Sequence, residues 1–76
     1  MKQEVADYLA EVAEDMGIVN WSIGEYHPEG LPHKKQLAFM FDGVTDLKRL
    51  RRNIVISKLD GTKTIIDTHQ NRVTIY

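Results

Sequence analysis

The stretch KQLAFMF, residues 35–41, decides how this chain folds, because it is apolar on both sides. Side chains alternate between the two faces of a strand, so Phe39 and Phe41 share one face while Ala38 and Met40 occupy the other. A strand that is apolar on both faces is normally central in its sheet or covered on both sides. The stretch therefore predicts a central strand, around which the other segments assemble.

An amphipathic helix is predicted for residues 2–16, before the central strand. Its apolar side chains recur at intervals of three and four residues, which places them on one stripe of a helix: Val5, Tyr8, Leu9, Val12 and Met16. Gly17 stands where a left-handed cap would end the helix. We expect the stripe to pack across one face of the sheet.

The rest of the chain predicts a second helix and the remaining strands. After the first helix the predicted order is strand 18–26, loop 27–34, strand 35–41, helix 46–52, strand 53–59, strand 62–67 and strand 72–76. Thr45 is expected to cap the short helix, because threonine is a favoured N-cap residue. Asp60-Gly61 is the strongest hairpin signal in the chain, since a type I′ turn needs two positive φ values.

These segments predict an α+β protein that forms a single domain over residues 1–76, in the order α-β-β-α-β-β-β. We expect a single, mostly antiparallel sheet of four to five strands, with the N-terminal amphipathic helix packed on one face and a short second helix. The last strand is a candidate sheet edge. An edge strand is open to strand addition by a partner or to pairing in a homodimer.

Length and composition disfavour several functional classes. A domain of this size buries only about 60% of its unfolded surface, which leaves little room for a substrate cavity. The absence of cysteine excludes disulfides, thiolate zinc sites and cysteine nucleophiles, and it favours a cytoplasmic protein. No run approaches the roughly 18 apolar residues of a membrane span, and no phosphate-binding, dinucleotide-binding or hydrolase motif occurs. We therefore expect a protein that is not an enzyme, uses no cofactor and does not enter a membrane.

The histidines are the candidate metal ligands or catalytic groups. His27 and His33 flank a proline-rich loop, at a spacing that matches no familiar metal site. Asp67 and His69 are two residues apart, so they would share one face of a strand. The sequence offers no nucleophile or pocket beside them. We predict no metal site and no catalytic residue.

The first helix carries an unbroken acidic face opposite its apolar stripe. Five acidic side chains fall within about 100° of arc on a helical wheel: Glu4, Asp7, Glu11, Glu14 and Asp15. Pairs of like charge four residues apart each destabilise a helix by about 0.2–0.5 kcal/mol. This acidic face is either a solubilising surface or a binding site for a basic partner, and both interpretations stay open at this point.

The second helix carries the basic cluster, which holds four of the ten Lys and Arg residues: Lys48, Arg49, Arg51 and Arg52. Lys34 and Lys35 are expected to extend it. Such a cluster can bind nucleic acid through counterion release, or it can bind an acidic protein, although so short a helix is unusual for reading DNA. The alternatives are a solvated face and an internal partner for the acidic face.

From these features we expect a small non-enzymatic binding protein that modulates a larger protein partner through the acidic helix face or a sheet edge. Its size and charge suit an accessory protein of bacteria or their mobile elements. A nucleic-acid-binding module that uses the basic cluster, and a self-associating structural subunit, are the alternatives. If the fold brings the acidic and basic surfaces together, both are structural. If it keeps them apart, at least one of them awaits a partner.

Overall fold

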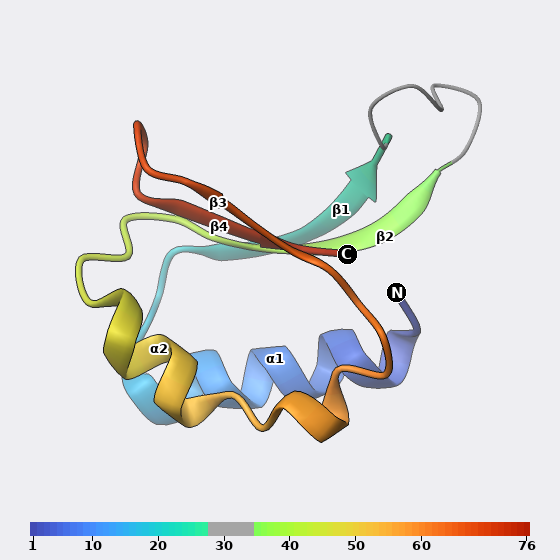
Figure 1. The fold of residues 1–76 in the computed structure, drawn as a ribbon, viewed down its shortest axis with the longest axis horizontal. Helices are drawn as coiled ribbons and strands as arrows, with labels where there is room; N and C mark the ends of the chain where they lie inside the picture. Colours follow the sequence, from blue (N-terminus) through green and yellow to red (C-terminus); the bar gives the residue numbers. More distant parts are fainter. Residues whose placement is uncertain (28–34) are drawn as a thin grey trace.

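The chain folds as a sheet with its helices on one side (Figure 1). The computed structural model describes residues 1–27 and 35–76. His33 and Lys34 therefore lie outside the described residues, as does most of the predicted loop. In chain order the elements are α1 (Gln3–Met16), β1 (Trp21–Tyr26), β2 (Gln36–Phe41), α2 (Leu47–Asn53), the 3₁₀ turn η1 (Ile56–Lys58), β3 (Thr64–Asp67) and β4 (Arg72–Ile75). These elements confirm the predicted α+β class.

The sheet has four strands in the order β1-β2-β4-β3, and every neighbouring pair is antiparallel. Two hairpins, β1–β2 and β3–β4, are joined by the pairing of β2 with β4. The central position predicted for the stretch 35–41 is confirmed, because β2 has a partner on each side. The last strand, β4, is internal too, so the expectation of an edge there was wrong. The free edges of the sheet belong to β1 and β3.

The core lies between the sheet and the helices. Phe39 and Phe41 of β2 are fully buried, as are Ile75 of β4, Leu9 of α1 and, at 1% exposure, Leu50 of α2. The apolar stripe of α1 therefore packs as its spacing predicts. The helix ends where expected, since the residue after its last turn is Gly17 with a φ of 71°.

The segment 53–59 does not form the predicted strand. Instead α2 continues to Asn53, two extended residues follow, and η1 turns the chain towards β3. The hydroxyl of Tyr8 accepts a hydrogen bond from the N–H of Val55 at 2.8 Å and donates one to the carbonyl of Asn53 at 3.4 Å. Because α1 binds these backbone groups, they are not available to a neighbouring strand.

The turn at Asp60 and Gly61 has the two positive φ values that its sequence predicts, 50° and 76°. It joins η1 to β3, however, and not one strand to another. Lys2 at the start of α1 forms an ion pair with Asp60, with 2.6 Å between Nζ and Oδ2. The turn is thus tied to the first helix, and the sheet keeps four strands.

Candidate functional site

The acidic face of α1 is fully on the outside of the molecule. Its five carboxylates, those of Glu4, Asp7, Glu11, Glu14 and Asp15, belong to exposed residues. Among the described residues, the one hydrogen bond to a side chain of this set comes from the amide of Gln3, 3.0 Å from Asp7. In the described part of the chain no ion pair joins these acids to the cations of α2. The acidic face therefore keeps its charge for the solvent or for a partner.

The basic cluster of α2 is exposed as well. Asp46, and not the predicted Thr45, caps the helix: its side chain accepts the backbone N–H of Arg49 at 3.0 Å. Among residues 1–27 and 35–76, no ion pair involves the side chains of the cluster, Lys48, Arg49, Arg51 and Arg52. The two charged surfaces therefore do not neutralise each other through direct contacts.

Lys35 does not extend the basic cluster. It forms an ion pair with Glu25 across the β1–β2 hairpin, with 3.6 Å between Nζ and Oε2. Lys35 directly precedes β2, whose beginning lies at the far end of the sheet from α2 (Figure 1). Because the segment 28–34 lies outside the described residues, the structure gives no position for Lys34.

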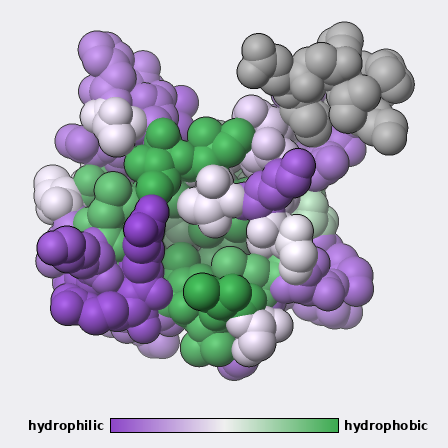
Figure 2. All heavy atoms as spheres, viewed as in Figure 1, coloured by the Kyte–Doolittle hydropathy of each residue, from purple (hydrophilic) through white to green (hydrophobic). Residues whose placement is uncertain are grey.

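An apolar groove lies between α2, η1 and the β3 side of the sheet, and we call it the β3 groove. Its volume is about 320 Å³. The described residues that line it are apolar apart from Arg51 and Thr64. They include Leu50, Arg51 and Ile54 from the α2 side, Ile56 from η1, and Thr64 and Ile66 from β3. Figure 2 shows apolar side chains gathered on this face, with hydrophilic side chains on both flanks.

Large apolar side chains are exposed at the groove and next to it. Ile56 of η1 is 81% exposed, and the preceding Val55 is 50% exposed. Ile65, on the other face of β3, is 39% exposed. Single exposed apolar residues are normal on protein surfaces, but a contiguous apolar patch with a polar rim often marks an interaction site. The β3 groove is a patch of that kind.

The free edge of β3 borders this groove. Lys63 and Tyr76 exchange both of their backbone hydrogen bonds, at 2.6 and 3.0 Å. Along an antiparallel pair of strands, every second residue forms its backbone hydrogen bonds with the partner strand. Ile65, two residues after Lys63, therefore also bonds to β4. The N–H and C=O groups of Thr64 and Ile66 point the opposite way, out of the sheet. Within the described residues no other backbone partner is recorded for either of them.

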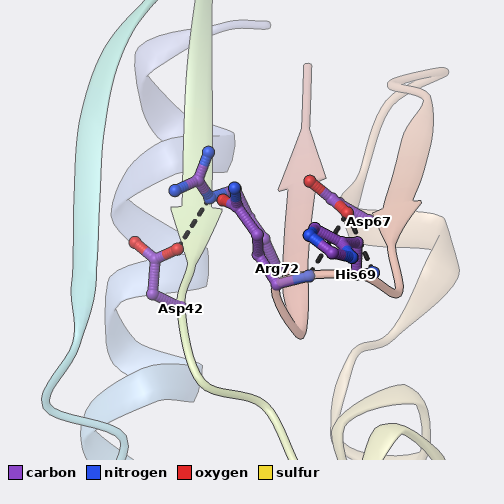
Figure 3. Close-up of polar contacts among 5 residues, drawn as sticks. Asp42, Asp67, His69 and Arg72 are labelled. Carbon is purple, nitrogen blue, oxygen red and sulfur yellow. Dashed lines mark hydrogen bonds and ion pairs between the residues drawn. The ribbon is translucent and has the colours of Figure 1, made fainter.

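Asp67 and His69 are close together, but they form a turn and not an acid–base pair (Figure 3). The carboxylate of Asp67 accepts the backbone N–H of His69 at 3.1 Å and that of Gln70 at 3.4 Å. This is an Asx turn, a common way of shaping a tight connection. The contact therefore explains the conformation of the β3–β4 turn.

Arg72 and Asp42 form the other polar contact in this region (Figure 3). The Nε of Arg72 lies 2.7 Å from Oδ1 of Asp42, and the pair links the start of β4 to the end of β2. The hydrogen bond to Asp42 raises the pKa of the Arg72 guanidinium above its ordinary value, with smaller contributions from the charges of Asp42 and Asp67. The contact fixes the two central strands at one end.

The described residues contain no candidate metal site and no candidate membrane-spanning helix. In that part of the chain no three His, Asp or Glu residues are close enough together to hold a metal ion. No helix there has both the length and the apolar composition needed to cross a bilayer.

The β3 groove was missed at the level of sequence because the segment 53–59 was interpreted as a strand. One signal against that strand was present. Ile54, Val55 and Ile56 are consecutive apolar residues, whereas a strand with one face in water alternates apolar and polar residues. A run of this kind beside a short helix also fits an irregular connection that packs against the core with some side chains and exposes others.

The fold and the β3 groove together define a small α+β protein with a free strand edge beside an apolar surface. No protein-family model, curated protein or solved structure matches the chain. Its function must therefore be argued from the site, because folds of the same class serve many functions.

Proposed function

We propose that this protein is a non-enzymatic binding module that holds an extended segment of a larger protein along the free edge of β3. One observation carries the proposal: the outward-pointing backbone groups of Thr64 and Ile66 directly border the apolar β3 groove. Recognition by strand addition needs these two features. Backbone hydrogen bonds supply affinity, and pockets for alternate side chains supply specificity.

The size of the site suits reversible binding. An added strand can pair with only four outward backbone groups of β3, and each hydrogen bond contributes a net stabilisation of about 0.5–1.5 kcal/mol. Apolar area buried in the groove adds about 25 cal/mol per Å². Part of this gain is offset by the loss of freedom on association. A regulator that must be released again from its partner fits such a balance.

We also propose a compartment for the protein and no enzymatic role. Binding by strand addition needs no reacting group, so the proposed function includes no catalysis. We place the protein in the cytosol, because a chain of this size without cysteine suits a reducing compartment.

Proline substitutions at the two free edges test the proposal. Random decapeptides displayed on phage are selected on the full chain, and the affinity of a selected peptide is measured by calorimetry. Thr64→Pro removes an outward N–H and leaves the β3–β4 ladder intact, so we expect the affinity to fall about tenfold or more.

Glu25→Pro is the matched control on the β1 edge. The N–H of Asp42 donates to the carbonyl of Asn20 at 2.8 Å, so by the same alternation Glu25 also points out of the sheet. We expect this variant to bind the peptide as the unaltered chain does. Equal losses in both variants, no loss in Thr64→Pro, or a selection that enriches no peptide would each refute the proposal.

Nucleic-acid binding remains the alternative, and it is favoured by the exposed cations of α2, which form no ion pair with the other described residues. It predicts that the chain is retained on immobilised DNA or RNA at low salt and released as the salt concentration rises. Arg52→Glu should then reduce retention as strongly as Arg51→Glu, because counterion release depends on charge number. Absence of retention at low salt would remove this alternative.

A further inference from the structure

We infer that the segment held at β3 is acidic: alternate apolar side chains fill the β3 groove, and an Asp or Glu of the segment forms an ion pair with Arg51. This inference rests on the proposed function and adds the chemistry of the partner to it.

Arg51 is the charged group of the groove. Of the described residues that line it, no other carries a charge. In the same part of the chain its guanidinium takes part in no recorded hydrogen bond or ion pair. An arginine keeps its charge at every physiological pH and binds carboxylates in a two-pronged geometry. A carboxylate on the occupant would therefore find a donor at the rim of the apolar surface.

The surroundings of Arg51 strengthen this preference. Lys48, Arg49 and Arg52 lie on the same two turns of helix, and they are exposed. The nearest acid in the sequence, Asp46, is engaged as the helix cap. The potential over this end of the groove is consequently positive. Complementary charge across an interface speeds association and disfavours partners of the wrong sign.

The groove itself selects a short row of apolar side chains. Its volume of about 320 Å³ stands at the low end of the range for small-molecule pockets. Thr64 and Ile66 project towards the helices, since Ile75 and Val73 opposite them are buried on that side. Every second residue of an added strand would do the same, at intervals of about 6.6–6.8 Å. The segment is thus apolar at alternate positions that face the groove, and its acidic residue lies on the same face, where Arg51 can reach it.

A second copy of this chain fits the same edge less well. Closed dimers are the commonest homo-oligomers, and their two-fold axis brings identical surfaces together. Pairing of β3 with β3 of another copy would place both basic clusters in one interface. Like charges in an interface are unfavourable. A partner of opposite charge avoids this repulsion.

A charge reversal at Arg51 tests the inference. Decapeptides from the random phage library are selected in parallel on the unaltered chain, on Arg51→Glu and on Arg52→Glu. Arg52→Glu is the matched control, because it makes the same charge change one residue away at a side chain that does not line the groove. We expect peptides from the unaltered chain and from Arg52→Glu to be enriched in Asp and Glu. Those from Arg51→Glu should instead be enriched in Lys and Arg.

The reversal of charge preference is then measured as the affinity of one peptide that was selected on the unaltered chain. Exchange of its acidic residue for lysine should weaken binding to the unaltered chain about threefold to tenfold and strengthen binding to Arg51→Glu by a similar factor. A role of Arg51 in folding alone would not reverse the preference. If Arg51→Glu and Arg52→Glu behave alike, or if the selected peptides show no acidic preference, the inference is wrong.

The outcomes also separate the inference from the proposed function. Peptides that lose affinity through Thr64→Pro but show no charge preference would overturn the acidic partner and leave strand addition standing. Peptides insensitive to Thr64→Pro would overturn both. A chain that self-associates with increasing concentration in sedimentation, and loses this through Thr64→Pro, would assign the edge to a second copy and overturn the inference.

Discussion

Tyr8 shows how one residue positions the candidate site. It lies on the stripe of α1, but its hydroxyl reaches the backbone of the segment after α2, at Asn53 and Val55. The ammonium of Lys58 lies 4.9 Å from the centre of the same ring. One side chain of the first helix thereby fixes both the end of α2 and η1. These two elements form one wall of the β3 groove.

Removal of the Tyr8 hydroxyl should therefore loosen this wall. We expect Tyr8→Phe to lower the free energy of unfolding by about 0.5–1.5 kcal/mol, because the hydroxyl both accepts and donates a hydrogen bond. Urea unfolding measures the change. Tyr26→Phe is the control: its ring stacks on Tyr76, but no hydrogen bond of its hydroxyl is recorded within the described residues, so the stability should stay nearly unchanged. Equal losses in the two variants would contradict the role of Tyr8.

At the scale of the elements, the connection from α2 to β3 decides what the molecule exposes. A fifth strand, as predicted for 53–59, would have covered the edge of β3. The actual segment leaves that edge free and places Ile56 beside it. Its last residues are held by the ion pair of Lys2 and Asp60, which joins the start of α1 to the turn before β3. Both side chains are more than half exposed, so the contribution of the pair is small.

This ion pair should give a defined pH dependence. The hydrogen bond and charge of Lys2 lower the pKa of Asp60, and Asp60 raises the pKa of Lys2 in the same way. The stabilisation from Asp60 is thus present above the ordinary Asp pKa of about 4 and is lost as pH falls through the lowered value. That from Lys2 is present below the ordinary Lys pKa of about 10.4 and is lost as pH rises through the raised value.

Asp60→Asn tests this dependence and suits the left-handed backbone at that position. The difference in urea midpoint between the unaltered chain and the variant should be constant from about pH 5 to 9 and should shrink below about pH 4. In a Lys2→Gln background the difference should not depend on pH in the acidic range. A difference that persists unchanged to pH 2 would show that the ion pair does not contribute.

The elements also show what a sequence can predict. The apolar spacing of α1, the glycine cap and the two-sided apolar strand β2 are local patterns, so they predict correct elements. The segment 53–59 has high strand propensity, but its conformation depends on Tyr8, which is 45 residues or more distant in the sequence. This segment forms one wall of the groove, and it is bonded to a residue far away in the sequence. The sequence could predict which residues form the acidic face and the basic cluster. Whether the two surfaces contact each other could be seen only in the folded structure.

At the scale of the whole molecule, the acidic and the basic surfaces lie on two different helices. α1 presents acids to the solvent, while α2 presents the basic cluster beside the apolar β3 groove. Figure 2 shows this apolar surface between hydrophilic flanks. Since no ion pair in the described residues links the two helices, the basic cluster remains available to a partner. The central claim is that this partner adds a strand to β3.

Hydrogen exchange in the complex tests this claim most directly. Amide exchange rates are measured by NMR on the full chain, free and saturated with a peptide selected from the phage library. Strand addition predicts slower exchange of the outward amides of Thr64 and Ile66, while that of Ile65, already bonded to β4, stays nearly the same. Unchanged rates at Thr64 and Ile66, with protection at α1 or along β1 instead, would contradict the account.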